Sequence, residues 1–164
     1  MATAVALLVG PVLVPREPLF VYNPSASVAP GWYRIERMGR GDSLRVGSTV
    51  LVRLPADVAA LAAQRGYLPN GVPILKRVGA LAPQSVCVSE QAVRIDGAVV
   101  AGVRLQDGMY RLLQAWGQCR ALVKGEVFLL SDTHPASFDS RYFGPVQVSA
   151  VLGIAHPLWI WSAP

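Results

Sequence analysis

Residues 74–95, ILKRVGALAPQSVCVSEQAVRI, decide the fold class of this 164-residue chain. They contain three short runs rich in Val, Ile and Leu, at 74–81, 85–89 and 92–95, separated by polar residues or proline. Such runs are typical of β-strands, and the Asp96-Gly97 pair directly after the third run is typical of a hairpin turn. These residues therefore predict a mainly β domain.

The same pattern continues on both sides of this stretch. One helix is expected over 57–65 (DVAALAAQR), because the run follows Pro55, stops at Gly66 and has Ala and Leu at helical spacing. Strands without intervening helices exclude repeated βαβ units. The further strands that we expect are 31–38, 49–54, 125–130 and 145–154.

Composition narrows the class of protein. Apolar residues make up 52% and charged residues 15% of the chain, which excludes a disordered protein and fits one folded domain. The formal charge of +5 is spread along the chain without a basic run, so we expect no nucleic-acid partner. With only two histidines and two cysteines, we expect no metal and no other cofactor.

The first residues differ from the rest. Residues 1–14 (MATAVALLVGPVLV) carry no charge but are fewer than the roughly 20 apolar residues of a membrane span. We expect residues 1–15 to be a signal segment or part of a truncated membrane anchor, and residues 16–164 to be the domain. A buried first strand is the alternative.

Two serines stand in a loop-like segment, residues 23–33 (NPSASVAPGWY). Ser25 and Ser27 are two residues apart, so on an extended chain both face the same side. Pro24, Pro30 and Gly31 favour a shaped loop, which is a frequent place for a nucleophile. By itself the segment is more typical of a surface turn.

Lys76 is the second unusual residue. Only two of the 15 basic residues are lysine, and Lys76 lies in the apolar strand 74–81. Burial lowers the pKa of a lysine, so that it can act as a base near neutral pH, whereas arginine stays charged. The alternative is an edge-strand lysine whose amino group reaches solvent.

A third polar segment is residues 137–145 (SFDSRYFGP). Asp139 and Arg141 could pair with each other or order hydroxyl groups near a site, and Ser140 lies between them. A surface turn with a marginal salt bridge is the alternative.

Other sites have little support. A Ser-His-Asp triad would require His134 or His156, and the chain has no GxSxG, P-loop, HExxH or GxGxxG motif. Cys87 and Cys119 lie far apart without a CxxC partner, so they are either two buried thiols or a disulfide.

Together the three segments resemble the TraF-type conjugative transfer peptidases, a branch of the type I signal peptidases with a Ser/Lys dyad. The matching stretches occur in the family's order and extend from about Tyr22 to the C-terminus. They are NPSASV (23–28), PGWY (30–33), LKRV (75–78) and HPASFDSRYFGP (134–145).

The resemblance assigns roles to single residues. Ser27 matches the nucleophile, Lys76 the general base and Ser25 the hydroxyl that supports the oxyanion hole. Asp139 matches the acidic residue that supports catalysis, and Arg141, with Ser140 in the same box, matches the structural arginine. Relatives of this type also carry a cysteine pair, which implies a Cys87–Cys119 disulfide.

The family implies a signal-peptidase- or LexA-like mainly β fold with one or two short helices, at the periplasmic face of the bacterial inner membrane. The implied substrate is an exported precursor, the conjugative pilin subunit. It would be trimmed at its C-terminus through an acyl-enzyme, which is then released by hydrolysis or by head-to-tail cyclisation. A general signal peptidase, a self-cleaving regulator and a catalytically silent conjugation component are the alternatives.

The sequence departs from the family pattern at two places. The proline usually found two residues after the nucleophile is here Pro30, one residue later, and residues 82–84 (APQ) replace the usual Pro-Gly-Asp. We expect the tail 159–161 (WIW) to complete the core, with contact to a membrane interface as the alternative.

Overall fold

The computed structural model describes residues 20–39, 42–89, 91–131 and 133–161. Its β-strands are β1 (Phe20–Asn23), β2 (Gly31–Glu36), β3 (Thr49–Val52), β4 (Ile74–Leu81), β5 (Ser85–Val88), β6 (Ala92–Ile95), β7 (Ala98–Gly102), β8 (Cys119–Ala121), β9 (Glu126–Leu130), β10 (Val146–Gln147) and β11 (Val151–Ile160). The helices are α1 (Ala56–Gln64), α2 (Ser140–Phe143) and the 3-10 turn η1 (Val148–Ala150).

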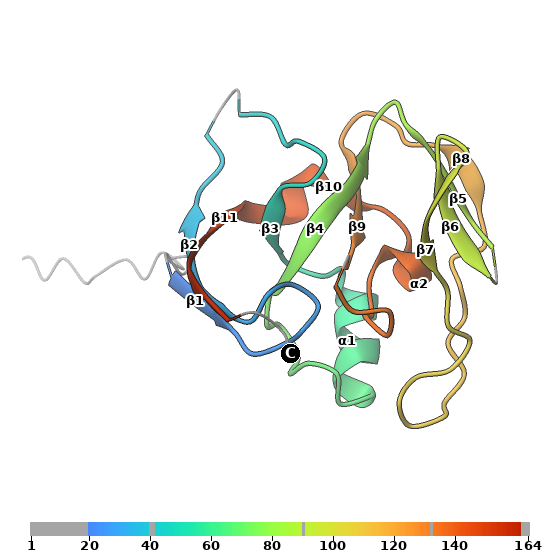
Figure 1. The fold of residues 1–164 in the computed structure, drawn as a ribbon, viewed down its shortest axis with the longest axis horizontal. Helices are drawn as coiled ribbons and strands as arrows, with labels where there is room; N and C mark the ends of the chain where they lie inside the picture. Colours follow the sequence, from blue (N-terminus) through green and yellow to red (C-terminus); the bar gives the residue numbers. More distant parts are fainter. Residues whose placement is uncertain (1–19, 40–41, 90, 132, 162–164) are drawn as a thin grey trace, which may run out of the picture.

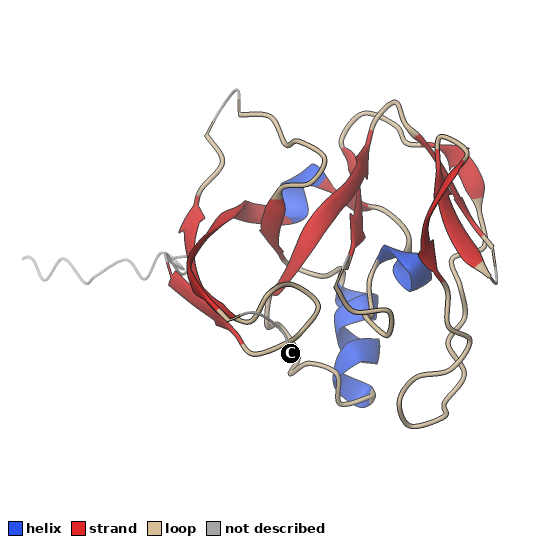
Figure 2. Cartoon of the chain, viewed as in Figure 1, coloured by secondary structure: helices blue, strands red, loops and turns tan. Residues whose placement is uncertain are grey.

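The strands form two antiparallel sheets (Figures 1 and 2). The large sheet has seven strands in the order β1-β2-β11-β3-β4-β9-β10, and the small sheet has four in the order β7-β6-β5-β8. The prediction of a mainly β fold with one or two short helices is confirmed. The expected helix is also found, one residue earlier than predicted, and it ends before Gly66.

A shared core joins the two sheets. Phe128 and Ala80 of the large sheet pack in one buried cluster with Val86 and Val93 of the small sheet. The chain leaves the large sheet after β4, builds the small sheet and a long loop over residues 103–118, and returns as β9. Because β4 and β9 pair directly, with Leu81 opposite Val127, this excursion begins and ends at one place in the large sheet.

The prediction of one continuous strand over residues 145–154 is wrong. The chain forms β10, the edge strand of the large sheet, against β9, then η1, and then β11 between β2 and β3. One straight strand cannot pair at two places in a sheet. The sheet is curled enough for three residues of η1 to connect these places (Figure 1).

Three strands were not predicted. β1 and β8 are four and three residues long, too short to show a pattern, and β7 is exposed along most of its length. The hairpin at Asp96-Gly97 is confirmed, since both residues have a positive φ, of 49° and 85°, and join β6 to β7.

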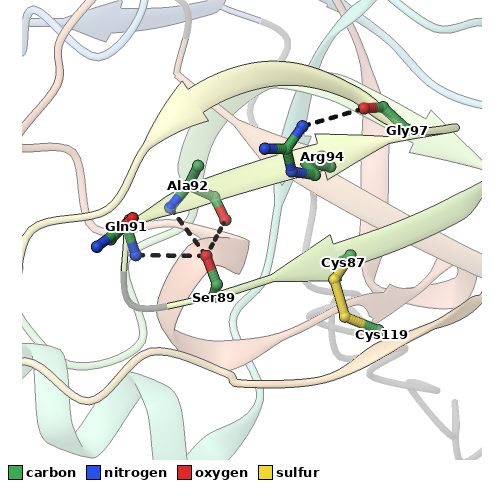
Figure 3. The surroundings of a disulfide bond; sticks show 7 residues. All are labelled: Cys87, Ser89, Gln91, Ala92, Arg94, Gly97 and Cys119. Carbon is green, nitrogen blue, oxygen red and sulfur yellow. Dashed lines mark hydrogen bonds between the residues drawn. A yellow bond between two sulfur atoms is a disulfide. The ribbon is translucent and has the colours of Figure 1, made fainter.

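The disulfide implied by the resemblance is confirmed. Cys87 on β5 lies opposite Cys119 on β8, and the two sulfur atoms are bonded (Figure 3). The bond links two residues that are 32 positions apart in the sequence, with β6, β7 and the loop 103–118 between them. It therefore ties both ends of this loop region to the small sheet.

The expectation that the tail completes the core is wrong. Leu158 to Trp161 are exposed, with Trp159 at 69%. β3 pairs with β11 only as far as Ile154, so beyond this point β11 is flanked by β2 alone and its side chains reach solvent. Trp32 of β2 and Trp161 pack against Tyr22 of β1, and Trp159 of β11 lies opposite Trp32. We call these four exposed aromatic residues the aromatic patch.

The signal or anchor expected in residues 1–15 lies outside the described residues. Within the described ranges, no helix has the length and apolar character needed to cross a bilayer.

We predict that Gly144→Ala destabilises the fold by more than Gly66→Ala. Gly144 combines φ 75° with ψ −170°, a region that is nearly restricted to glycine, and an added Cβ would lie 2.7 Å from Trp116 Cδ1. Gly66 also has a positive φ of 70°, but a Cβ there would meet no atom within 4 Å. We expect a loss of about 1–2 kcal/mol for Gly66→Ala and about 1–3 kcal/mol more for Gly144→Ala, measured by urea unfolding. Equal losses would contradict the packing of Trp116 against Gly144.

Candidate active site

The turn between β1 and β2 presents Ser25 and Ser27. Residues 25–28 bend and do not form the extended segment assumed from the sequence, yet the two Oγ atoms lie 3.0 Å apart. Asn23, at the end of β1, shapes the turn: its Nδ2 donates to the carbonyls of Ser25 and Val28, each at 2.9 Å. One buried amide side chain thus fixes the turn that carries both serines.

Two further hydrogen bonds hold this turn from outside. The Tyr33 hydroxyl on β2 donates to the Ala29 carbonyl at 2.6 Å, and Thr133 Oγ1 donates to the Ala26 carbonyl at 2.6 Å. Ala26 directly precedes Ser27. The backbone next to Ser27 is therefore fastened to a segment more than one hundred residues away in the sequence.

The hydroxyl proton of Ser25 already takes part in a hydrogen bond. Ser25 Oγ donates to Asn23 Oδ1 at 2.9 Å, and a hydroxyl has a single proton. In this arrangement Ser27 donates to Ser25 Oγ. Ser25 can donate to another oxygen only if its hydroxyl rotates away from Asn23.

Lys76 is a buried lysine on β4. Its side chain is 5% exposed, and Nζ donates to Ser137 Oγ at 2.6 Å. Burial, the largest effect, lowers the pKa of Lys76 from 10.5 to about 8. The Asp139 carboxylate opposes this change and the Arg141 guanidinium adds to it. At pH 7 roughly one lysine in ten is then neutral and able to accept a proton.

Behind Ser137 lies a buried ion pair. Arg141 donates to Asp139 from Nε at 2.8 Å and from Nη2 at 2.7 Å, and both side chains are at most 1% exposed. Asp139 also accepts from the backbone N–H of Ser131 at 2.9 Å and of Arg141 at 3.2 Å, the second of which caps α2. The pair connects the end of β9 with the beginning of α2.

The guanidinium of Arg141 organises the surrounding backbone. It donates to the carbonyls of Gly102 and Pro135, each at 3.0 Å, and of Ser137 at 3.2 Å. Ser140, fully buried, accepts a hydrogen bond from the Leu129 N–H at 2.9 Å. These bonds fix the segment 133–137 to β9 and to the small sheet, and so place Ser137 Oγ against Lys76.

A cavity of about 860 Å³ brings the two polar groups together. Ser25, Ser27, Lys76 and Ser137 all line it. Within the described residues Ser27 bonds to Ser25 and Lys76 to Ser137, so Ser27 and Lys76 face one cavity without bonding to each other. Hydrogen bonds between catalytic groups often tighten only when substrate binds.

The remaining predicted residues lie elsewhere. Asp139, Ser140 and Arg141 do not line the cavity but support Ser137 from behind. His134 lines it, whereas His156, on β11, does not.

Sequence reasoning missed three positioning residues, namely Asn23, Thr133 and Ser137. Asn23 and Ser137 stand inside the quoted segments. The signal for them was a short polar side chain two residues before a proposed site residue, Ser25 in the case of Asn23 and Asp139 in the case of Ser137. The role of Thr133 depends on a contact between distant segments, which no local pattern shows.

This arrangement is suited to nucleophilic chemistry. A hydroxyl and a partly neutral amine face one solvent-accessible cavity, which is what base-assisted attack on a carbonyl requires. Each group is held by its own set of hydrogen bonds.

Comparisons with known proteins show the family of this chain. Residues 1–161 match the family model described as signal peptidase, peptidase S26. The conjugal transfer protein TraF of Agrobacterium tumefaciens (strain 15955) is 33% identical over 158 residues, which cover 90% of this chain and 80% of the relative. The probable conjugal transfer protein TraF of Sinorhizobium fredii (strain NBRC 101917 / NGR234) is 33% identical over 92% of this chain and 76% of its own length.

Solved structures also align with this chain. A signal peptidase I from Enterococcus faecalis V583 aligns with a TM-score of 0.43 and 21% identity, over 69% of this chain and 97% of that chain.

The match to the family model spans residues 1–161, and the two TraF relatives align with 90% and 92% of the chain. The chain therefore belongs to the signal peptidase S26 family and is related to the TraF proteins of conjugal transfer.

Proposed function

We propose that this protein is a serine endopeptidase in which Ser27 is the nucleophile and Lys76 the general base. The observation that carries the proposal is the buried Lys76, held by Ser137 at 2.6 Å with a lowered pKa, on the same cavity as Ser27. A serine in this family needs a base, and the other basic groups on the cavity are arginines or the exposed His134.

The first half-reaction follows from these groups. Neutral Lys76 has one lone pair, and its bond to Ser137 limits where that lone pair points. It takes the proton of Ser27 Oγ after Ser27 turns from Ser25, and Oγ attacks the scissile carbonyl. The Ser27 N–H and the Ser25 hydroxyl hold the oxyanion. Lys76 then gives its proton to the leaving amine, and an acyl-enzyme remains.

The second half-reaction sets the product. If water attacks the acyl carbon, Lys76 accepts its proton, the ester bond to Ser27 Oγ breaks, Oγ takes the proton back from Lys76, and a linear carboxylate is released. If the amino terminus of the same substrate attacks in the same way, a new peptide bond replaces the ester bond and closes a ring. Both outcomes use the same residues. The substrate that we propose is an exported precursor of the conjugation apparatus, the pilin subunit.

Asp139, Ser140 and Arg141 have a supporting role in this proposal. The Asp139–Arg141 pair holds the segment that carries Ser137, and Ser137 holds Lys76. Asp139 therefore acts on the reaction through Lys76 and does not touch the substrate.

We place the enzyme at the periplasmic face of the inner membrane, with residues 1–15 as signal or anchor and residues 16–164 as the peptidase domain. The aromatic patch supports this placement. Tyr22 packs against Trp32 with ring centroids 5.3 Å apart and against Trp161 at 6.0 Å, and Tyr22 also lines the cavity. Amphipathic aromatic rings are the side chains that favour a membrane–water interface.

We predict that Ser27→Ala, Lys76→Ala and Lys76→Arg each abolish processing of the pilin precursor while urea unfolding stays close to the wild type. Lys76→Arg is the sharpest of the three, because it keeps the charge but removes the titratable base. Incubation of purified protein with the precursor, followed by mass spectrometry, is the measurement. Wild-type turnover by any variant would disprove the dyad.

The same spectra separate the alternatives. A product one water lighter than the trimmed linear peptide would establish cyclisation. Trimming alone would support hydrolysis, and removal of signal peptides from unrelated precursors would support a general signal peptidase. A folded wild-type protein without turnover would support a catalytically silent component.

We predict that kcat/KM rises about tenfold per pH unit up to about pH 8 and then levels off. The neutral form of Lys76 is the active base, and its pKa is about 8, so activity falls as pH drops and the lysine becomes protonated. In Ser137→Ala the ammonium loses its acceptor, so the acid limb should move to lower pH while kcat falls. If the wild type and Ser137→Ala had the same pH profile of kcat/KM, Lys76 would be contradicted as the base.

We predict that a Trp32→Ala/Trp159→Ala variant binds vesicles of phosphatidylethanolamine and phosphatidylglycerol about tenfold more weakly than the wild type, measured by co-sedimentation. The two indoles are 47% and 69% exposed. Tyr110→Ala is the control, since Tyr110 is 84% exposed on the loop 103–118, across the molecule from the patch (Figure 1). Equal binding by all three proteins would exclude the patch as a membrane contact.

A further inference from the structure

The cavity has a second polar wall away from Ser27 and Lys76. This wall is built by the residues that follow α1 and by the loop 103–118, which runs beside the end of α1 (Figure 1). Its ionisable residues are Arg65, Tyr67, Asp107 and Arg111, all of which line the cavity. The proposed mechanism uses none of them.

Hydrogen bonds hold this wall in place. Asp107 Oδ2 accepts from the Tyr67 hydroxyl at 2.5 Å and from Arg111 Nε at 2.8 Å. Arg111 also donates to the Arg65 carbonyl at 2.9 Å, and Arg65 donates to the Leu112 carbonyl at 2.9 Å. The two arginines therefore have defined positions, and ordering them for a ligand costs little further side-chain entropy.

The wall carries an uncompensated positive charge. Two guanidinium groups share one carboxylate, and Arg111 takes the close contact with it, while Arg65 Nη1 is 3.7 Å away. Burial, the largest effect, raises the pKa of Asp107, but hydrogen bonds from Tyr67, Met109 and Arg111 outweigh it and hold that pKa well below its usual value. Asp107 stays ionised and cannot neutralise both arginines.

The arginines also have free donors. Arg65 Nε and Arg111 Nη1 donate to no residue in the part of the chain that the structure describes. Their side chains are 22% and 38% exposed. A guanidinium that is partly shielded from water, with unused N–H groups on a cavity, binds a carboxylate more strongly than one on an open surface.

We propose that Arg65 and Arg111 form a subsite for a carboxylate of the peptide substrate. The carboxylate is either an Asp or Glu side chain away from the scissile bond or the substrate's C-terminus. The inference deepens the proposed function and rests on it. Apolar residues of the same cavity, among them Leu68, Val72 and Met109, would contact the peptide next to the charged group.

The test measures binding in the full-length Ser27→Ala variant. The probes are fluorescein-labelled, alanine-rich decapeptides in which one Asp or one Asn is moved through every position, each with a free or an amidated C-terminus. We expect either one Asp position or the free C-terminus to bind about tenfold more tightly than its neutral counterpart. Which of the two does so identifies the source of the carboxylate.

Substitutions in the same background assign the preference to residues. Arg65→Gln should remove the preference for the acidic peptide and leave binding of the neutral peptide unchanged, and Arg65→Lys should retain part of the preference. Arg104→Gln is the matched control, because Arg104 is an exposed arginine at the start of the same loop that does not line the cavity. If Arg65→Gln merely loosened the loop, binding of acidic and neutral peptides would weaken to the same extent.

The outcomes separate this inference from the proposed function. Equal binding of acidic and neutral peptides, or a preference that survives Arg65→Gln, overturns the subsite. If Arg65→Gln removes the preference but the wild-type protein cleaves no peptide, the subsite stands and the peptidase proposal fails.

Discussion

The buried ion pair between Asp139 and Arg141 is the constraint on which the rest of the site depends. Removing either partner of such a pair leaves a charge in the protein interior, which typically costs about 3–5 kcal/mol. Here the pair also bonds to the Gly102 carbonyl on β7, to the Ser131 N–H and to the carbonyls of Pro135 and Ser137. The ion pair therefore ties the small sheet to the segment that carries Ser137 and sets the position of this serine.

Ser27 and Lys76, the proposed nucleophile and base, are held by separate parts of the fold. Ser27 belongs to a turn governed by Asn23, whereas Lys76 belongs to a central strand and is oriented by Ser137. Thr133 connects the two, because its segment carries Ser137 and its hydroxyl binds the Ala26 carbonyl.

Much of the fold and part of the site could be predicted from the sequence, and the reasons lie in particular residues. Residues 74–95 contain short apolar runs with clear breaks, and both the strands and the Asp96-Gly97 hairpin appear where those breaks place them. The roles of Ser27 and Lys76 came from a family resemblance that the comparisons support at the level of the family.

What could not be predicted depends on contacts between distant residues. The curl of the large sheet divides residues 145–154 between two pairing partners, and no local pattern contains that information. Trp159 has a sequence context typical of a core residue, but only the sheet order shows that no strand covers it. The two arginines on the second wall of the cavity are 46 residues apart and meet only because the loop folds back onto α1. Because β4 and β9 pair directly, the excursion that supplies Asp107 and Arg111 to this wall, residues 82–125, is topologically the connection of a single β-hairpin. Such a connection can change in length and sequence while the register of its two strands is kept. Evolution can therefore alter this part of the cavity wall without disturbing the strand that carries Lys76.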